Sequence, residues 1–412
     1  MENIRVLIIG KVWPESNSSA AGSRMIQLIM LFKEQDWNIT FASSARESEF
    51  TDNLEVLGIK KADIKLNDVS FDSFVKELNP SFVLFDRFMT EEQFGWRVAE
   101  QCPGALRILD TEDLHCLRVG RQLALKEERQ FKNNDLISDH AKREIASIYR
   151  CDLSLIISPI EMGILRDFFR VDTSLLHYLP FMLESIINEE KNKWLPYEER
   201  KHFISIGNFL HEPNWDAVRY LKEEIWSKIR YKLPDAELHI YGAYSSDKVF
   251  QLHNSNEGFK IKGRAEVVQD VMEGSRVCLA PLRFGAGIKG KLIDAMQCGT
   301  PSVTTDIGAE GMADGLEWSG SIQNDVEAFV ESAVELYHDK QVWTKAQANG
   351  EAIINSIYPK KEIGKKLINR VNEMLEHLPD HRASNFVGTM LLYHSMASTK
   401  FMSKWIEEKN KK

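Results

Sequence analysis

The sequence PLRFGAGIKGKLIDAMQCGTPSVTT, residues 281–305, joins two short apolar strands through a glycine-rich loop and a helix. The strands are expected at residues 277–280 and 302–304. The helix is expected to begin near Lys289 and to stop at Gly299, because glycine commonly follows a helix C-terminus. Strand, loop, helix and strand in this order form the repeating unit of a parallel sheet. The segment therefore predicts an α/β fold with parallel strands.

The loop of this segment has the composition of an anion site. Gly285 and Gly287 let backbone N–H groups approach a ligand, and the following helix N-terminus carries a partial positive charge. Lys289 and Lys291 add full charges where they oppose the helix dipole, which a bound phosphate or pyrophosphate would explain. The alternative is a surface loop before an ordinary helix, since Ile288 belongs to an apolar stripe at helical spacing. The spacing of a P-loop is absent.

The composition is that of a globular enzyme. The 412 residues predict two or three domains, and the net charge of -9 disfavours nucleic acid as the main partner. The five cysteines are scattered without a C-x-x-C spacing, so neither a zinc site nor a disulfide framework is predicted.

The chain begins like a strand and lacks the features of a secretory signal peptide. No apolar run approaches the ~18 residues of a membrane span. We therefore expect a cytoplasmic protein, with peripheral membrane contact as an open alternative. Residues 385–412 carry an apolar patch and end in lysines, so they either dock on the first domain or lie on an anionic membrane surface.

Short apolar strands alternate with amphipathic helices in two series, separated by a polar segment. The expected strands of the first series are residues 5–9, 39–42, 82–85, 106–109, 153–157 and 175–178. Those of the second series are residues 203–206, 237–241, 259–261, 277–280 and 302–304. The pattern predicts two Rossmann-like, doubly wound domains, at 1–180 and 201–360, facing a cleft. A linker is expected at 181–200, and C-terminal helices at 361–412 are expected to cross back to the first domain.

Ligands of such sheets lie at the carboxyl ends of the strands. Polar or glycine residues follow several expected strands, namely Gly10, Asp110, Gly207, Asn208 and Gly242. Their convergence favours an anion site at the cleft over an ordinary loop. Asn214, further along the same loop as Asn208, is instead expected to cap a helix.

Residues 110–118 place several charged groups and one histidine directly after a buried strand. His115 can exchange protons near neutral pH, which suits a general base or an acceptor-binding group, and Asp113 would orient it. The alternative is a capped helix start with Thr111 or Asp110 as the N-cap, although this gives no reason for His115. The opening Asp-Thr-Glu resembles a metal-binding D-x-D motif only loosely, so no metal site is expected.

The loop at residues 10–24 is rich in small residues and leads into a helix. Small residues such as Gly22 leave room for a ligand beside the first strand, while a flexible connection is the alternative. The Gly-x-Gly-x-x-Gly spacing of a dinucleotide site is absent, so a nicotinamide cofactor is not indicated.

The segment from residue 204 to residue 312 resembles the glycosyltransferases of the two-Rossmann-domain GT-B fold, and specifically family four. The similarity is carried by Ile206-Gly-Asn, Pro213-Asn-Trp-Asp-Ala, Leu238-His-Ile-Tyr-Gly, Lys262-Gly-Arg, residues 280–301 and Gly308-Ala-Glu-Gly. The first half is similar mainly in layout. The resemblance implies transfer of a sugar from a nucleotide sugar to an acceptor, with retention at the anomeric carbon and no required metal.

The resemblance also implies roles for individual residues. Asp294 stands where the family usually has a glutamate that contacts the ribose, and the loop from Gly285 to Gly287 would hold the pyrophosphate together with Lys289 or Lys291. The implied catalytic residues are Lys291, Lys289 and His115. The implied donor-binding residues are Gly207, Asn208, Gly242, Gly263, Arg264, Arg283, Gly285, Ala286, Gly287, Ile288 and Asp294. The implied acceptor-side residues are Gly22, Arg24 and Asp113.

The sequence departs from the family pattern at two places. Ala286 replaces the first of two glutamates eight positions apart, which removes a carboxylate often near the donor sugar hydroxyls. The basic pair that often follows Gly207 is missing, so the loop lysines or Arg283 must neutralise the leaving phosphate. A catalytically inactive protein that binds a nucleotide or a partner is therefore an alternative, and a nucleotide-sugar epimerase is a third. The acceptor is expected to be a glycan, a lipid-linked group or a small molecule.

Overall fold

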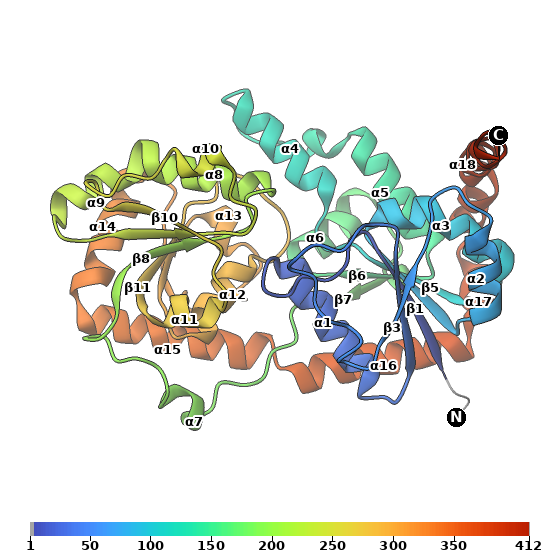
Figure 1. The fold of residues 1–412 in the computed structure, drawn as a ribbon, viewed down its shortest axis with the longest axis horizontal. Helices are drawn as coiled ribbons and strands as arrows, with labels where there is room; N and C mark the ends of the chain where they lie inside the picture. The colour runs from blue at the N-terminus through green and yellow to red at the C-terminus, as the bar shows by residue number, and fades with distance from the viewer. Residues whose placement is uncertain (1–3, 412) are drawn as a thin grey trace.

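The first domain is built on a parallel sheet of seven strands, in a computed structural model that describes residues 4–411 (Figure 1). The strand order is β3-β2-β1-β4-β5-β6-β7. The strands are β1 (Arg5–Gly10), β2 (Asn38–Ser43), β3 (Lys60–Asp63), β4 (Phe82–Asp86), β5 (Leu106–Asp110), β6 (Leu153–Ile156) and β7 (Leu176–Tyr178). The helices between them are α1 (Ala20–Lys33), α2 (Ser70–Leu78), α3 (Phe88–Gln101), α4 (His115–Lys126), α5 (Asp139–Arg150) and α6 (Pro159–Gly163).

The second domain has a parallel sheet of six strands in the order β10-β9-β8-β11-β12-β13. The strands are β8 (Lys201–Ile206), β9 (Leu238–Tyr241), β10 (Phe259–Gly263), β11 (Ser275–Ala280), β12 (Ser302–Thr304) and β13 (Gly320–Ile322). Its helices are α8 (Glu212–Tyr220), α9 (Trp226–Lys232), α10 (Asp247–Phe250), α11 (Val268–Glu273), α12 (Gly290–Gln297), α13 (Asp306–Ala309), α14 (Val326–His338) and α15 (Lys340–Ile357). A π-helical turn at Leu221–Ile225 joins α8 to α9.

The central strands are apolar on both faces because helices cover both sides of each sheet. In β1, Val6 and Ile8 belong to one hydrophobic cluster, whereas Leu7 and Ile9 belong to another on the opposite face. This alternation follows the two-residue period of a strand. A continuous apolar run therefore marks a buried parallel strand.

The strand order reverses at corresponding positions of the two sheets. β1 pairs with both β2 and β4, and β8 pairs with both β9 and β11. Connections leave such a pair of strands in opposite directions, which opens a crevice at their carboxyl ends. The two crevices face each other across the domain boundary, because loops after both pairs line one cleft.

The C-terminal helices cross from the second domain to the first, as Figure 1 shows. α16 (Lys360–Glu376) contributes Leu367 and Val371 to the hydrophobic cluster that contains β1. α17 (Leu378–Ser384) leads into α18 (Phe386–Asn410), which packs against α3 and α5. No helix of residues 4–411 combines the length and the apolar composition that crossing a membrane requires.

The segment expected as a linker, residues 181–200, contains the short helix α7 (Asn188–Lys191). Its first part is buried rather than solvated, because Phe181, Leu183 and Ile186 pack in a hydrophobic cluster with β11 and α12. Leu183 also forms a β-bridge with Pro359, just before α16. The two chain crossings between the domains therefore lie together.

All expected strands are present, with ends that differ by at most two residues. The sequence did not predict β3 or β13, and it gave a helix at the place of α4 only as the alternative interpretation of residues 110–118. The expectation that Asn214 caps a helix was wrong, because α8 begins at Glu212 with His211 in the N-cap position. Thr111 and Asp110 do not cap α4 either. Its N-cap is Leu114, and the Glu144 carboxylate of α5 accepts hydrogen bonds from the first two amides of the helix.

Candidate active site

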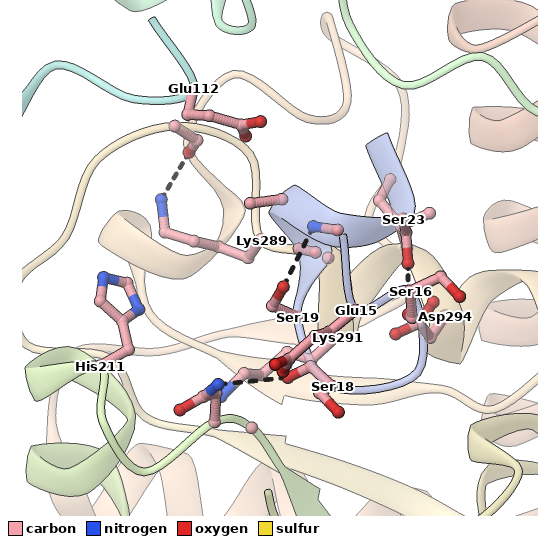
Figure 2. A pocket seen from close by; sticks show the side chains of 18 of the residues that line it. Glu15, Ser16, Ser18, Ser19, Ser23, Glu112, His211, Lys289, Lys291 and Asp294 are labelled. Carbon is pink, nitrogen blue, oxygen red and sulfur yellow. Dashed lines mark hydrogen bonds between the residues drawn. The ribbon is translucent and has the colours of Figure 1, made fainter. Parts of the chain in front are cut away.

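A cleft of about 880 Å³ lies between the two domains (Figure 2). Loops at the carboxyl ends of β1, β4 and β5 line it from the first domain, and loops after β8, β9 and β11 line it from the second. Small-molecule sites typically have volumes of roughly 300–1,000 Å³. The cleft therefore has the place and the size of a ligand site.

The glycine-rich loop and the N-terminus of α12 form one wall of the cleft. Gly287 has a φ of 65°, and a Cβ there would lie 3.0 Å from the Asp113 Cβ of the first domain. A Cβ at Gly290 would lie 2.5 Å from the Cβ of Ala20, at the start of α1. The close approach of the domains therefore requires glycine at both positions. Within residues 4–411, no side chain caps α12, so its first amides can serve a ligand.

Lys289 and Lys291 stand at this helix N-terminus and line the cleft. The Lys289 ammonium donates hydrogen bonds to the carbonyl oxygens of Gly287 and Ala286, at 2.6 and 3.2 Å. The Lys291 ammonium donates to the Asn214 amide oxygen at 2.8 Å. Burial lowers the pKa of each lysine to about 8. Both groups are therefore largely charged at neutral pH, in a place where no carboxylate accepts from either ammonium among the described side chains.

Asp294 lies one turn further along α12 and also lines the cleft. Burial raises the pKa of its carboxyl to about 7, and the charge of Lys291 opposes this rise. The carboxyl is thus close to half ionised at neutral pH. A hydroxyl of a bound molecule could donate to it or accept from it.

His115 and Asp113 form the facing wall from the first domain. The His115 Nε2 atom lies 3.5 Å from Asp113 Oδ1, and Asp113 also pairs with Arg118. Burial lowers the pKa of His115 to about 3, although the Asp113 carboxylate favours the charged form. Burial alone would raise the pKa of Asp113, but Arg118 and His115 hold it below its ordinary value. At neutral pH the pair is therefore a neutral imidazole beside a carboxylate.

Sequence reasoning missed two buried carboxyl groups beside this wall. Glu161 accepts hydrogen bonds from the amides of Leu114 and Gly287, at 3.0 and 2.8 Å, and so bridges the domains. Glu112 lines the cleft with a φ of 62°, and its Oε1 atom has no hydrogen-bond partner among the described residues. Burial raises the pKa of both groups to about 8. Both residues follow expected strands closely. The rule that ligands lie at the carboxyl ends of parallel strands could therefore have found them.

His211 was likewise not predicted and lines the cleft from the loop before α8. Burial lowers its pKa to about 4, while Asp113 across the cleft favours the charged form. Figure 2 shows His211 and Lys289 around the same pocket as the serines of the loop before α1. His211 therefore offers a second neutral imidazole to a ligand.

Several side chains connect the domains around the cleft. Arg121 of α4 donates to both carboxylate oxygens of Glu310, at 2.8 and 2.6 Å, and to the Gly285 carbonyl oxygen at 2.9 Å. The Tyr244 hydroxyl donates to the Glu15 carboxylate at 2.7 Å. These contacts hold the two walls at the distance that the structure shows.

Most of the residues predicted for the site come together in the cleft. The predicted residues that line it are Gly22, Asp113, His115, Gly207, Asn208, Gly242, Arg264, Gly285, Ala286, Gly287, Ile288, Lys289, Lys291 and Asp294. Gly242 is needed where the ends of β8 and β9 approach closely, since a Cβ on it would lie 2.3 Å from the Gly207 carbonyl oxygen, and a Cβ on Gly207 would lie 2.7 Å from the Asn214 side chain.

Three residues with implied roles, and the strand-end residues Gly10 and Asp110, lie outside the lining of the cleft, as far as the described residues show. Arg24 is buried within the first domain, where it pairs with Asp110 at 2.8 Å. Arg283 pairs with Asp216 beside α8. Gly263 ends β10, and its carbonyl oxygen accepts from the Gly242 amide. The partners of both arginines are distant in sequence, which is why their positions could not be seen there.

Comparisons with known proteins agree with this geometry. Residues 200–339 match the family model described as glycosyl transferases group 1. A comparison with curated protein sequences gave no significant match. Several solved glycosyltransferase structures are similar to this chain over both domains.

TarM of S. aureus, in complex with fondaparinux, α-GlcNAc-glycerol and UDP, has a TM-score of 0.68 and 10% identity, over 90% of this chain and 100% of the TarM chain. The pneumococcal O-GlcNAc transferase GtfA, in complex with UDP and GlcNAc, has a TM-score of 0.65 and 12% identity, over 91% and 100% of the two chains. WaaG, a glycosyltransferase involved in lipopolysaccharide biosynthesis, has a TM-score of 0.61 and 10% identity, over 89% and 99%.

The family match covers the domain that carries α12 and its loop, while the structural similarity covers both domains. The fold that the sequence resemblance implied is thereby confirmed. The chain has the two-domain GT-B fold of these glycosyltransferases, and its second domain matches the group 1 glycosyl transferases.

Proposed function

We propose that the chain transfers a sugar from a nucleotide-diphosphate sugar to a hydroxyl group, with retention at the anomeric carbon. The observation that carries this proposal is the pair Lys289 and Lys291, half-buried in the cleft at the N-terminus of α12. Two neighbouring, partly buried ammonium groups are unfavourable unless an anion neutralises them. A diphosphate has the charge and the size to do this at a helix N-terminus.

The donor would lie along the second domain. Its diphosphate would contact the amides of α12 and the two lysines, and its ribose would contact Asp294. Arg264, which lines the cleft after β10, would lie beside the base. UDP-linked sugars are the first donors to test, because the TarM and GtfA structures contain UDP.

In the proposed reaction, the bond between the anomeric carbon and the diphosphate oxygen breaks and the acceptor oxygen bonds to the same face of the sugar. Negative charge grows on the leaving diphosphate, and Lys291, Lys289 and the α12 amides stabilise it. The acceptor proton passes to the departing phosphate oxygen. His115 is neutral at pH 7 and would orient a hydroxyl through a hydrogen bond.

We also propose that transfer needs no metal ion, since the lysines and amides supply the positive charge at the diphosphate. Turnover should be unchanged by EDTA. A loss of turnover in EDTA that Mg²⁺ or Mn²⁺ restores would contradict the proposal.

A catalytically inactive nucleotide-binding or partner-binding protein is the second candidate, because Ala286 lacks the family's first carboxylate. Its methyl group packs with apolar side chains of the first domain. The Glu161 carboxyl does reach the neighbouring Gly287 amide. A carboxyl group of the first domain therefore lies beside Ala286, the position where the family's first glutamate is missing.

Incubation with UDP-, GDP- and ADP-sugars, followed by product analysis, separates these candidates. The proposed transferase releases the nucleoside diphosphate and forms a glycoside with the anomeric configuration of the donor. Saturable nucleotide binding without hydrolysis or transfer to glycan, lipid-linked and small-molecule acceptors would favour the inactive protein. Conversion of the donor sugar without an acceptor would favour an epimerase.

We further propose that α18 contacts an anionic membrane surface, at the cytoplasmic face where nucleotide sugars are available. Its outward face exposes large apolar side chains, including Phe386, Tyr393, Phe401 and Trp405. Lys404 and Lys409 are exposed near its end. Aromatic and basic side chains on one helix face suit the interface of an anionic bilayer. Such contact would bring a lipid-linked acceptor near the enzyme.

A further inference from the structure

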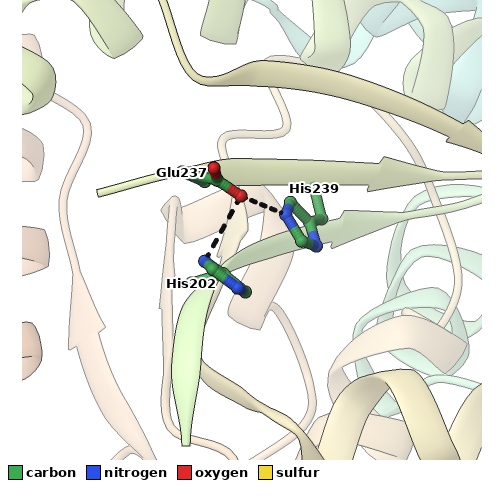
Figure 3. A group of neighbouring side chains, drawn as sticks. All are labelled: His202, Glu237 and His239. Atoms are coloured by element: carbon green, nitrogen blue, oxygen red, sulfur yellow. Dashed lines mark hydrogen bonds and ion pairs between the residues drawn. The ribbon is translucent and has the colours of Figure 1, made fainter. Parts of the chain in front are cut away.

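Three side chains that commonly bind metal ions meet in the second domain, outside the cleft (Figure 3). They are His202 of β8, Glu237 directly before β9, and His239 of β9. The Glu237 Oε2 atom lies 2.9 Å from His239 Nε2 and 3.6 Å from His202 Nδ1. One donor atom of each side chain lies within 4.8 Å of the others.

The strand register places these side chains on one face of the sheet. Phe203 lies opposite Leu238, and Ile204 lies opposite His239. By the same register, His202 of β8 lies opposite Glu237, the residue before β9. Because side chains alternate along a strand, Glu237 and His239 share a face, and His202 lies beside them. A parallel pairing of two central strands thus holds the three donors together.

The chemistry of the three donors suits a transition metal. Two imidazole nitrogens and one carboxylate oxygen form a common ligand set for Zn²⁺, with a water molecule completing a tetrahedron. Zinc–ligand bonds of about 2.0–2.1 Å place neighbouring donors roughly 3.4 Å apart. The two separations from Glu237, 2.9 and 3.6 Å, are close to that value. The two imidazole rings, which stack with centroids 4.2 Å apart, would turn so that both nitrogens face the ion.

The protonation states at neutral pH also suit a metal ion, provided that His239 Nε2, which hydrogen-bonds to Glu237 Oε2 at 2.9 Å, gives up its proton to Nδ1 or to solvent. Burial lowers the pKa of both histidines, and the hydrogen bond from Lys260 is the main cause that lowers the pKa of Glu237 to about 2. The two rings stack with centroids 4.2 Å apart, an arrangement that disfavours charge on both. Neutral imidazoles and an ionised carboxylate are the forms that bind metals.

We propose that His202, Glu237 and His239 bind one divalent transition-metal ion, with Zn²⁺ as the probe that tests it. The three side chains are partly exposed, so an ion can reach them. Lys260 donates to the other carboxylate oxygen of Glu237 at 2.5 Å and leaves Oε2 for the ion. Lys260 then orients the carboxylate as an outer hydrogen-bond donor.

The site lies at the amino ends of β8 and β9, whereas the cleft lies at their carboxyl ends. The bound ion would cross-link two central strands without contacting the donor. Its effect is therefore structural stabilisation of the nucleotide-binding domain. This inference does not depend on the proposed transfer reaction.

Calorimetric titration of the full-length protein with ZnCl₂ tests the proposal. The wild type is expected to bind one Zn²⁺ per chain, and its Tm is expected to rise by about 2 °C or more at saturation. His239→Phe keeps a stacked ring without the donor nitrogen, and His202→Asn keeps a residue that tolerates the positive φ of 63°. Each variant should weaken binding by about tenfold or more.

The control variant is His338→Asn, which removes an exposed histidine of the same domain. It should bind Zn²⁺ like the wild type. Glu237→Gln tests the carboxylate ligand, since it keeps the shape of the side chain and removes its charge. The proposal is overturned if the wild type shows no saturable binding of one ion, or if the His202, His239 and Glu237 variants all bind as tightly as the wild type. The five cysteines are buried and do not compete in the folded protein.

Discussion

At the scale of single residues, the proposed role of Lys291 rests on its charge and its partial burial. Its ammonium lies half-buried at a helix N-terminus, and the amide oxygen of Asn214 is its hydrogen-bond partner. A neutral partner does not offset the cost of burying the charge. The position is therefore suited to an anion that arrives with the ligand, and the growing charge of a leaving diphosphate is such an anion.

Lys291→Ala should lower kcat by about 100-fold or more, because removing one preorganised donor to a developing anion typically costs that much. The Kd of the nucleoside diphosphate should rise far less. Steady-state kinetics and calorimetry on the same preparations measure the two effects. Lys345→Ala, which removes an exposed lysine of the same domain, is the matched control. A near-normal kcat in Lys291→Ala would remove Lys291 from the mechanism.

The buried carboxyl of Glu161 makes stability depend on pH. Its pKa is about 8 in the folded chain because of burial, against an ordinary value of 4.5. Between pH 6.5 and 8 the folded chain therefore retains a proton that the unfolded chain has released. The free energy of unfolding should fall as pH rises through this window. Burial raises the pKa of Glu112 in the same way, so this carboxyl also lowers the free energy of unfolding as pH rises.

Urea denaturation at pH 6.5 and pH 8 measures this dependence. Glu161→Gln should flatten it, since glutamine keeps an oxygen for the Leu114 and Gly287 amides and does not titrate. The histidines of the cleft have pKa values of about 3 and 4, and their unfolded forms are mostly neutral above pH 6.5. Stability that rises with pH in this window, or a slope that Glu161→Gln leaves unchanged, would contradict the assignment.

At the scale of elements, buried strands could be predicted from sequence and exposed ones could not. β1 and β4 are continuous apolar runs, whereas β3 has the sequence Lys-Lys-Ala-Asp at a sheet edge. α4 was predicted only as an alternative, and with the wrong capping residues, because its N-terminus lacks a local cap. Glu144 supplies the acceptors from 28 and 29 residues away, and such partners are not visible in sequence. The rule that ligands lie at the carboxyl ends of parallel strands still located most of the cleft, because this rule depends only on the buried strands.

The exposed apolar face of α18 gives a prediction for this element. The wild type should sediment with vesicles that contain phosphatidylglycerol, and high salt should weaken the binding. Replacing both Phe401 and Trp405 by glutamate should abolish it, because the outward face then repels the surface. Phe250→Glu, at an exposed apolar position of the second domain, is the control. Equal binding by the double variant, or no binding by the wild type, would refute membrane contact through α18.

At the scale of the whole molecule, the site exists only where the two domains meet. The second domain supplies α12 and its lysines, while the first supplies His115 and the loop before α1. The contact of Arg121 with Glu310 and the Gly285 carbonyl oxygen fixes the glycine-rich loop against α4. The sequence could predict the two domains and the cleft, but not these contacts, because they join residues more than 160 positions apart.

Arg121→Ala should lower kcat/KM for the donor by about tenfold, since the conformation in which both walls of the cleft face each other becomes less populated. Glu310→Ala should have a similar effect, and the double variant should lose little more than either single variant. Steady-state kinetics of the four proteins form a double-mutant cycle. Fully additive effects would show that the pair does not act as a unit.

The most direct test of the central claim compares the binding of UDP, GDP, ADP and the matching nucleosides to the wild type and to a Lys289→Ala, Lys291→Ala double variant. The shift in melting temperature reports the binding of every ligand. Saturation at about 100 times Kd stabilises the folded state by about 2.7 kcal/mol. The account predicts a shift of several degrees with one nucleoside diphosphate, little shift with its nucleoside, and a clearly smaller shift in the double variant. Unchanged melting with all three diphosphates, or equal shifts in the wild type and the double variant, would contradict a diphosphate site at the N-terminus of α12.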